Sequence, residues 1–268
     1  MFAAATRSSA DPVPEKAAIA KGSTLPLMRA LILSAGQGSR LLPLTRDRPK
    51  CMLPVGSRTV IEWQVKQLAA GGVDEIVVVL GFQAALVESH LATLAGPSLK
   101  IRTIFNPFFS VADNLGSCWL ACGEMDRDFI ILNGDTLFEP AVLARLLASP
   151  AAPITVTIDR KAEYDADDMK VRTEGTRLRE IGKTLPLDRV NGESIGMLLF
   201  RGAGPGLFAE AIDRTMHTPD GLKWWYLKVI DILARDGTVE TVSIEGLQWG
   251  EIDFHEDLEQ AERMVRAW

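Results

Sequence analysis

The chain has 268 residues, 47% of them hydrophobic and 24% charged, an ordinary globular composition that can bury a full core as one large domain or as one domain with an appended lobe. Its formal net charge is −6 and it contains no run of Lys or Arg, which argues against a nucleic-acid-binding surface and favours a small-molecule partner. It has no apolar run of the roughly 18 residues that cross a membrane and no apolar core of a secretory signal, so we expect a cytoplasmic protein without a membrane partner.

The first half of the chain alternates between strand-like and helix-like segments. Residues 1–27 are rich in Ala, Ser, Pro and charge without periodicity, which predicts a disordered N-terminal extension before a folded part that begins at Met28. Hydrophobic patterns then predict strands at 28–36, 75–81, 100–106 and 128–135 and helices at 60–70, 84–94 and 115–124. This alternation predicts a parallel sheet wrapped by helices.

The pattern changes beyond about residue 150, so we divide the folded part into two halves, 28–150 and 151–268. Strands joined by short turns are predicted at 153–160, 169–175, 176–183 and 194–200. An amphipathic helix at 257–268 is expected to pack back on the sheet.

The three cysteines do not form a recognisable metal or disulfide pattern. Cys51, Cys118 and Cys122 are an odd number without CxxC spacing, which argues against a disulfide framework or a zinc site. Cys118 and Cys122 lie four residues apart in an apolar stretch and are expected to be buried as small hydrophobic residues.

A glycine-bearing turn, Leu33 to Arg40, follows the first predicted strand. Such turns present backbone N–H groups to phosphate oxygens, although a plain structural turn is the alternative interpretation. Leu41 replaces the third glycine of a dinucleotide fingerprint, and no Gly-Lys-Ser/Thr of a Walker A loop follows. Two cations lie nearby, Arg40 and Lys50, and a triphosphate needs both charge neutralisation and a bidentate contact.

The stretch LSAGQGSRLLPLTRDRPKCMLPVGSRTVIEWQV, which begins at Leu33, resembles the signature of sugar-1-phosphate nucleotidylyltransferases and of bacterial phosphocholine cytidylyltransferases. The resemblance implies a Rossmann-like three-layer α/β nucleotidyltransferase fold with a mostly parallel sheet, a nucleotide-binding half at 28–150 and a strand-rich substrate-binding half at 151–268. It also implies that Lys50 contacts the α-phosphate region. The residues implied to surround the triphosphate are Ala35, Gly36, Gly38, Ser39 and Arg40.

Carboxylates at two places are candidate metal ligands. Asp135 ends a buried strand at the edge of the sheet where ligands usually bind, although Asp is also common in plain turns. Glu251 and Asp253 are two residues apart and share a face if the stretch is extended, either as metal ligands or as a solvated strand face. Mg²⁺ prefers such oxygen ligands. The resemblance implies that Asp135, Asp253 and Glu251 hold a catalytic magnesium.

The loop from Ser110 to Ser117 precedes a predicted helix, where small polar residues ordinarily cap the helix. The matching loop of the family lies beside the nucleobase and ribose. The resemblance therefore makes Asn114 and Ser117 candidates for contacts with the nucleoside.

The second half resembles the phosphocholine-type branch more than the sugar branch, through the segments DMKV, IGK, GESIG, Trp225-Tyr226 and WGEID in that order. Lys170 and Lys183 are candidates for holding the substrate phosphate, with surface lysines as the alternative. Trp225 and Tyr226, together with Trp224 and the more distant Trp249, offer aromatic faces to an ammonium head group, and Glu193 or Asp188 would add charge. Core packing is the alternative for each aromatic residue.

Together these features predict a Mg²⁺-dependent nucleotidylyltransferase that transfers CMP from CTP to a small phosphate or phosphonate of the phosphocholine or 2-aminoethylphosphonate type and releases pyrophosphate. The predicted catalytic residues are Arg40, Lys50, Asp135 and Asp253. A substrate phosphate is already anionic near neutral pH, so no general base is required.

Three alternatives remain open to different degrees. A sugar-1-phosphate or inositol-1-phosphate nucleotidylyltransferase would differ only in the second half of the chain. A non-catalytic nucleotide-binding regulatory module is disfavoured by the presence of Lys50, Asp135 and Asp253. A dinucleotide-dependent oxidoreductase is disfavoured by Leu41.

Overall fold

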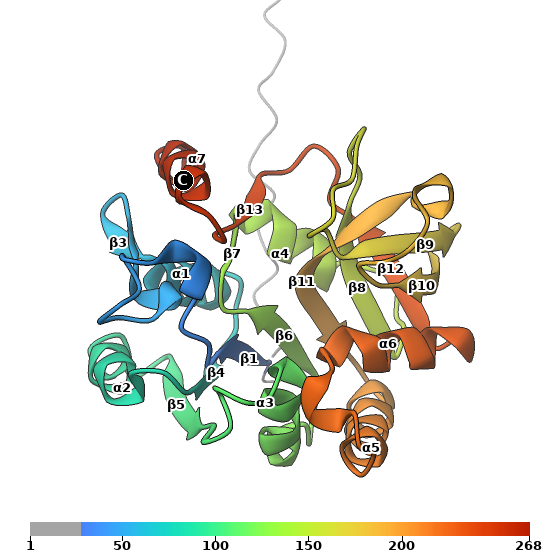
Figure 1. The fold of residues 1–268 in the computed structure, drawn as a ribbon, viewed down its shortest axis with the longest axis horizontal. Coiled ribbons are helices and arrows are strands. Elements are labelled where there is room, and N and C mark those ends of the chain that lie inside the picture. Colours follow the sequence, from blue (N-terminus) through green and yellow to red (C-terminus); the bar gives the residue numbers. More distant parts are fainter. Residues whose placement is uncertain (1–27) are drawn as a thin grey trace, which may run out of the picture.

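The computed structural model describes residues 28–268, and the predicted N-terminal extension at 1–27 lies outside the described residues. A nine-stranded sheet in the order β5-β4-β1-β6-β11-β8-β12-β10-β9 runs through the molecule (Figure 1). Its strands are β1 (Arg29–Ser34), β4 (Glu75–Leu80), β5 (Lys100–Phe105), β6 (Phe129–Asn133), β8 (Ile154–Asp159), β9 (Lys170–Glu174), β10 (Arg177–Ile181), β11 (Gly192–Phe200) and β12 (Val239–Ser243).

Two small sheets lie outside the large one. The first pairs β2 (Pro54–Val55) with β3 (Arg58–Thr59), and the second pairs β7 (Thr136–Phe138) with β13 (Trp249–Glu251). The helices are α1 (Val60–Ala70), α2 (Ala84–Ala92), α3 (Asn114–Leu120), α4 (Pro140–Leu147), α5 (Gly204–Met216), α6 (Tyr226–Arg235) and α7 (His255–Val265).

The predicted alternation of strands and helices in the first half is confirmed. Helix α1 begins with a capping box, because the Thr59 hydroxyl accepts from the Glu62 N–H at 3.3 Å and the Glu62 carboxylate accepts from the Thr59 N–H at 2.6 Å. Strands β5, β4, β1 and β6 are all parallel to one another. Since β4 lies on one side of β1 and β6 on the other, the strand order reverses at β1, and ligands of such sheets usually bind in the crevice formed there.

The same sheet continues into the second half of the chain, because β11 pairs antiparallel with β6. Beyond that pair the strands are mixed in direction: β8 is antiparallel to β11, and β12 is parallel to β8. The parallel part of the sheet therefore belongs mainly to residues 28–150, and the two halves of the chain share one continuous sheet.

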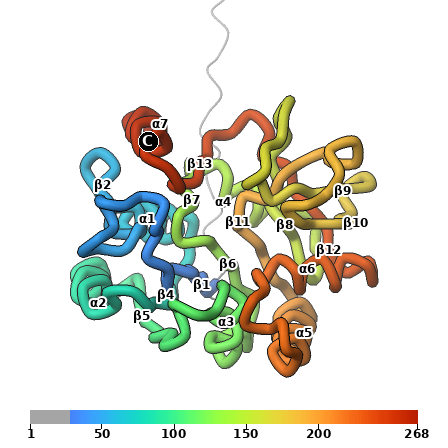
Figure 2. The backbone as a smooth tube through the Cα atoms, in the orientation of Figure 1, coloured from blue at the N-terminus to red at the C-terminus, as the bar shows by residue number. Residues whose placement is uncertain are grey.

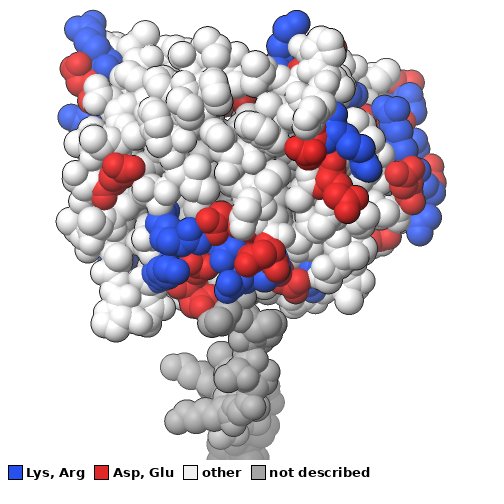
Figure 3. Space-filling model, turned by 90° about the horizontal axis from the view of Figure 1, so that it is seen from below, with Lys and Arg blue, Asp and Glu red and all other residues white. Residues whose placement is uncertain are grey.

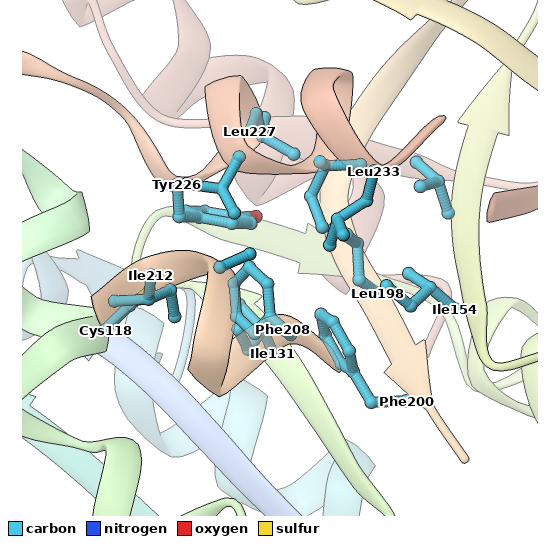
Figure 4. Packing of buried hydrophobic residues seen from close by; sticks show 14 of the residues in the cluster. Cys118, Ile131, Ile154, Leu198, Phe200, Phe208, Ile212, Tyr226, Leu227 and Leu233 are labelled. Carbon is cyan, nitrogen blue, oxygen red and sulfur yellow. The ribbon is translucent and has the colours of Figure 1, made fainter. Parts of the chain in front are cut away.

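Helices cover both faces of the sheet, which confirms the three-layer α/β fold. Alternate strand residues such as Ile32 and Leu132 pack under α1, α2 and α4, whereas Leu31 and Ile131 pack under α3, α5 and α6. Figure 4 shows the second of these clusters, in which ring and aliphatic side chains from α5 and α6 meet those of the strands. The prediction for Cys118 is confirmed, because it is fully buried in this cluster, whereas Cys122 is half-buried and all three cysteines are free.

Three helices of the structure were absent from the sequence-based assignment: α4, α5 and α6. Helices α5 and α6 supply much of one face of the core, including Phe208 and Tyr226, so the second half is less purely strand-based than the sequence indicated. Helix α7 is confirmed as an element. It packs with Trp63 of α1 and Val55 of β2 rather than on the nine-stranded sheet, so the C-terminal segment lies beside α1 and β2 (Figure 2).

An ion-pair network joins the first three parallel strands. Glu75 of β4 is 2.8 Å from the Arg29 guanidinium of β1 and 3.0 Å from that of Arg102 of β5. On the face shown in Figure 3, basic and acidic side chains likewise lie beside one another. Within residues 28–268, every helix is too short or too polar to cross a membrane.

Candidate active site

The topology brings three distant segments together at the carboxyl ends of β1 and β6. The glycine turn follows β1 directly, and Asp135 follows β6. Strand β13 pairs antiparallel with β7, and the Ile252 N–H donates to the Asp135 carbonyl oxygen at 3.2 Å. This pairing places Asp253 beside Asp135, although more than a hundred residues separate them in the sequence.

Backbone and side-chain contacts fix the shape of the glycine turn. Gly38 has a φ of +80°, and an added Cβ there would lie 2.9 Å from the Cβ of Lys50, so only glycine fits without displacement. The buried Thr45 hydroxyl donates to the Gly38 carbonyl at 2.8 Å, and the Lys50 N–H donates to the Gln37 carbonyl at 3.2 Å. The turn and Lys50 are therefore held against each other.

The Lys50 ammonium group bridges the two carboxylates. Its Nζ is 2.7 Å from Oδ2 of Asp135 and 2.6 Å from Oδ1 of Asp253. Burial acts to lower the pKa of Lys50, but the two negative charges outweigh it and raise the pKa above its ordinary value. Lys50 therefore carries a full positive charge throughout the physiological pH range.

Arg40 extends this cluster toward solvent. Its guanidinium is 3.0 Å from Asp253, lies 5.1 Å from the centre of the Phe254 ring, and is 3.3 Å from Asp167. Asp253 thus contacts both cations that were predicted to bind the triphosphate, Arg40 and Lys50. The arrangement places Arg40 at the mouth and Lys50 at the floor of the same crevice.

Asp135 retains a free ligand position. Its Oδ1 is buried and has no hydrogen-bond partner, a costly situation that a bound cation would relieve. Burial, together with the charges of Asp135 and Asp253, raises the pKa of Glu251 to about 8. Across residues 28–268, no three His, Cys, Asp or Glu side chains gather closely enough to form a metal site by themselves. The donor set fits a cation held by Asp135 and Asp253, and Glu251 as a third ligand stays a prediction.

Two connected cavities occupy the crevice. One, of about 460 Å³, is lined by the predicted metal ligands Asp135 and Asp253 and by five of the predicted nucleotide-binding residues: Gly36, Gly38, Ser39, Arg40 and Lys50. The other, of about 560 Å³, is lined by Ala35, Gly36, Asn114 and Ser117. Both cavities include Leu33, Gly36 and Asp113 in their walls, so they adjoin one another.

Asn114 and Ser117 also have structural roles. The Asp113 carboxylate caps α3 by accepting from the Asn114 N–H at 2.9 Å, which confirms the capping expected for this loop. The Asn114 side-chain oxygen accepts from the Tyr226 N–H at 2.9 Å, and the Ser117 hydroxyl accepts from Asn106 at 3.0 Å. Both side chains line the cavity while they tie the loop to its surroundings.

A third, smaller cavity of about 110 Å³ opens between the two halves of the chain. It is lined by Lys183, Trp225 and Asp167, among others. The Lys183 ammonium is 5.1 Å from the centre of the Trp225 ring and 3.4 Å from Asp167. The structure thus brings two of the predicted substrate-binding residues together.

Lys170 and Tyr226 do not join this cavity, which corrects the sequence-based selection. Lys170 is 3% exposed and its ammonium donates to the Lys183 carbonyl oxygen at 2.9 Å, so it supports the backbone that carries Lys183. Tyr226, the first residue of α6, is completely buried in the core, where it packs on Phe208 of α5 and its hydroxyl donates to the Asn133 side-chain oxygen at 3.3 Å. The core alternative was the right one for Tyr226.

Glu193 belongs to an acidic cavity that sequence reasoning did not foresee. It is buried and lies 3.0 Å from the Lys161 ammonium, which also contacts Asp168 at 2.9 Å. Burial, with a hydrogen bond to Asp168, raises the pKa of Glu193 to about 7. The cavity measures about 350 Å³, and its acidic lining residues are Asp159, Asp165, Asp167, Asp168, Glu193, Glu251, Asp253 and Asp257.

Lys161 and Asp167 were missed because they stand in an irregular segment between β8 and β9. The sequence feature that could have indicated this part of the site is the acidic run Asp165-Ala166-Asp167-Asp168. Only its last residue, Asp168, entered the prediction, as the start of the segment DMKV. A charge run of this kind is usually a solvated surface, and only the fold shows that it faces a cavity.

Comparison with known proteins agrees with this geometry. The model of the nucleotidyl transferase family matches residues 29–168. The CMP-5'-(3-aminopropyl)phosphonate synthase of Streptomyces rubellomurinus is 33% identical over 88% of this chain, which spans 38% of that protein. The N-acetylmuramate α-1-phosphate uridylyltransferase of Caulobacter vibrioides is 36% identical over 81% of this chain and 89% of its own length.

A solved structure shares the fold of this chain. The CTP:phosphocholine cytidylyltransferase of Streptococcus pneumoniae superposes with a TM-score of 0.73 at 19% identity, covering 89% of this chain and 99% of that one. At this identity the likeness establishes the fold alone. The glycine turn, the Lys50 bridge and the match of the family model together show that the chain belongs to the nucleotidyl transferase family.

Proposed function

We propose that this protein is a Mg²⁺-dependent cytidylyltransferase that transfers CMP from CTP to a small phosphate or phosphonate carrying an ammonium group and releases pyrophosphate. The observation that carries the proposal is the Lys50 ammonium held between Asp135 and Asp253 at the floor of the cavity that follows the glycine turn. CTP is preferred because the relative from Streptomyces rubellomurinus is named for CMP and the structural neighbour from Streptococcus pneumoniae is named for CTP.

The chemistry needs a nucleophile, an in-line leaving group and charge neutralisation. The acceptor oxygen is already anionic, since the second pKa of a phosphomonoester is about 6, so this chain needs no general base. Lys50 and the N–H groups of the glycine turn would stabilise the charge on the α-phosphate, and Arg40 would hold the outer phosphates. Magnesium held by Asp135 and Asp253 would supply Lewis-acid neutralisation of the phosphate oxygens.

The charge of the acceptor cavity supports an ammonium-bearing substrate. The small cavity with the Lys183 cation and the acidic cavity have Asp167, Met169, Ser194 and Glu251 in common, so a cationic end and an acidic end form one space. A zwitterion with a phosphate or phosphonate at one end and an ammonium group at the other matches both ends. We assign Lys183, which lies beside Trp225, to the phosphate or phosphonate end and the Asp168–Glu193 pair to the ammonium end.

A sugar-1-phosphate nucleotidylyltransferase is the second candidate, because the uridylyltransferase named above is 36% identical to this chain. Away from their phosphate, many sugar phosphates carry only hydroxyl groups. Such substrates bring no positive charge to the eight acidic side chains of the acidic cavity, whose lining within residues 28–268 contains one cation, Lys161. We therefore favour the ammonium-bearing class.

Pyrophosphate release from purified protein with Mg²⁺ tests the proposal. CTP, UTP, GTP and ATP would each be combined with phosphocholine, 2-aminoethylphosphonate, 3-aminopropylphosphonate, glucose-1-phosphate, N-acetylmuramate-1-phosphate and inositol-1-phosphate. We expect release with CTP and an amine-bearing acceptor. Release with a sugar phosphate alone would instead establish the second candidate.

The substitutions Asp135→Asn and Asp253→Asn should each lower the rate of pyrophosphate release by at least about a hundredfold, because each removes a negative charge that holds the cation and orients Lys50. Both variants should still unfold cooperatively in urea. Asp236→Asn, at an exposed position after α6 and outside the described cavities, is the matched control and should keep the wild-type rate. A wild-type rate in either test variant would overturn the metal assignment.

The acceptor affinity should depend on pH through Glu193. Its pKa is raised to about 7, so the carboxylate that attracts an ammonium group forms only as the pH rises through that value. The ratio of kcat/KM between wild type and Glu193→Gln should therefore increase by up to about tenfold between about pH 6 and about pH 8. Using the ratio cancels the titration of the acceptor itself. A ratio that does not change with pH would show that Glu193 does not contact the ammonium group.

A further inference from the structure

Asp167 joins two cations that come from opposite sides of the crevice. Its Oδ2 is 3.3 Å from Nη1 of Arg40, which follows the glycine turn, and its Oδ1 is 3.4 Å from Nζ of Lys183, which follows β10. Asp167 itself lies in the segment between β8 and β9. The Asp167 carboxylate thus connects the cavity that contains Arg40 to the small cavity that contains Lys183.

Both of these cations would hold phosphate groups in the proposed reaction. Arg40 lines the cavity assigned to the triphosphate, and Lys183 lines the cavity assigned to the acceptor. In the part of the chain that the structure describes, Asp167 is the one carboxylate that forms an ion pair with Lys183. The Asp167 carboxylate therefore already occupies the position beside Lys183 that the phosphate or phosphonate group of the acceptor would need.

We propose, on the basis of the proposed function, that the Asp167 carboxylate takes the place of the acceptor's phosphate or phosphonate group until a triphosphate engages Arg40. Triphosphate oxygens compete for Arg40 and repel the nearby carboxylate, so Asp167 loses one of its two partners. Its remaining contact with Lys183 is then easier for an incoming anion to replace. Asp167 thereby couples the two subsites and favours nucleotide binding before acceptor binding.

The expected coupling is modest, because the ion pairs are partly exposed to water. The side chains of Arg40 and Asp167 are 45% and 55% exposed, and exposed ion pairs contribute little free energy. Nucleotide binding should therefore tighten acceptor binding about two- to fivefold, and by thermodynamic reciprocity the acceptor should tighten nucleotide binding by the same factor.

Titration calorimetry with 3-aminopropylphosphonate as the probe tests this coupling. Affinity would be measured with Mg²⁺, with and without the α,β-methylene analogue of CTP, whose carbon bridge prevents the loss of pyrophosphate. Wild-type protein should bind the probe about two- to fivefold more tightly when the analogue is present. Asp167→Asn should bind it tightly in both conditions, with a ratio near one, and should lower KM for the acceptor more than it changes kcat.

Glu163→Gln is the matched control, because it removes one negative charge from an exposed position of the same segment. It should retain the wild-type ratio. The proposal is overturned if Asp167→Asn binds the probe more weakly than wild type or keeps the dependence on the nucleotide. A failure of the proposed function would look different: no pyrophosphate release by the wild-type protein, with the binding measurements still giving a ratio for each variant.

Discussion

The ammonium group of Lys50 between Asp135 and Asp253 is the interaction on which the site depends. Without it, two carboxylates would face each other in a partly buried crevice, and burial of like charges is costly. The bridge also joins the glycine turn to the ends of two strands, since Lys50 packs against Gly38 and the carboxylates follow β6 and β13. One side chain thus fixes the positions of three segments.

The bridge belongs to a longer row of alternating charges across the crevice. From the acceptor side inward, the row consists of Lys183, Asp167, Arg40, Asp253, Lys50 and Asp135. Each cation assigned to a phosphate group is already paired with a carboxylate of the chain. Substrate phosphates would bind by replacing these carboxylates, so the free protein avoids unpaired cations while the groups stay in position for catalysis.

Much of the fold and of the crevice at the glycine turn could be predicted because both depend on local sequence. Buried strands such as β4 are continuous apolar runs, α1 has a capping box, and the glycine turn precedes Lys50 in one uninterrupted motif. The pairing of Asp135 with Asp253 could be expected only from the family resemblance, because β7 and β13 lie far apart in the chain.

The acceptor side could be predicted less well, since its character depends on burial and on long-range neighbours. Tyr226 and Lys170 have the residue types of a head-group and phosphate site, yet one is in the core and the other supports the backbone. Asp167 has the appearance of a surface residue in the sequence, and its two cationic partners come from distant segments. Helices α5 and α6 were overlooked although they shape this half of the core.

If Asp135 and Asp253 hold the cation, Lys50 competes with a divalent cation for these two carboxylates. Binding of Mn²⁺ to the nucleotide-free protein tests this competition most directly. The electron paramagnetic resonance of the free ion would report the binding. Methionine has nearly the length of lysine without its charge, so Lys50→Met should leave both carboxylates available and bind Mn²⁺ at least about tenfold more tightly than wild type. Adding Asp135→Asn to Lys50→Met should remove this gain. Equal Mn²⁺ affinity in wild type and Lys50→Met would contradict the assignment of the two carboxylates as the cation site.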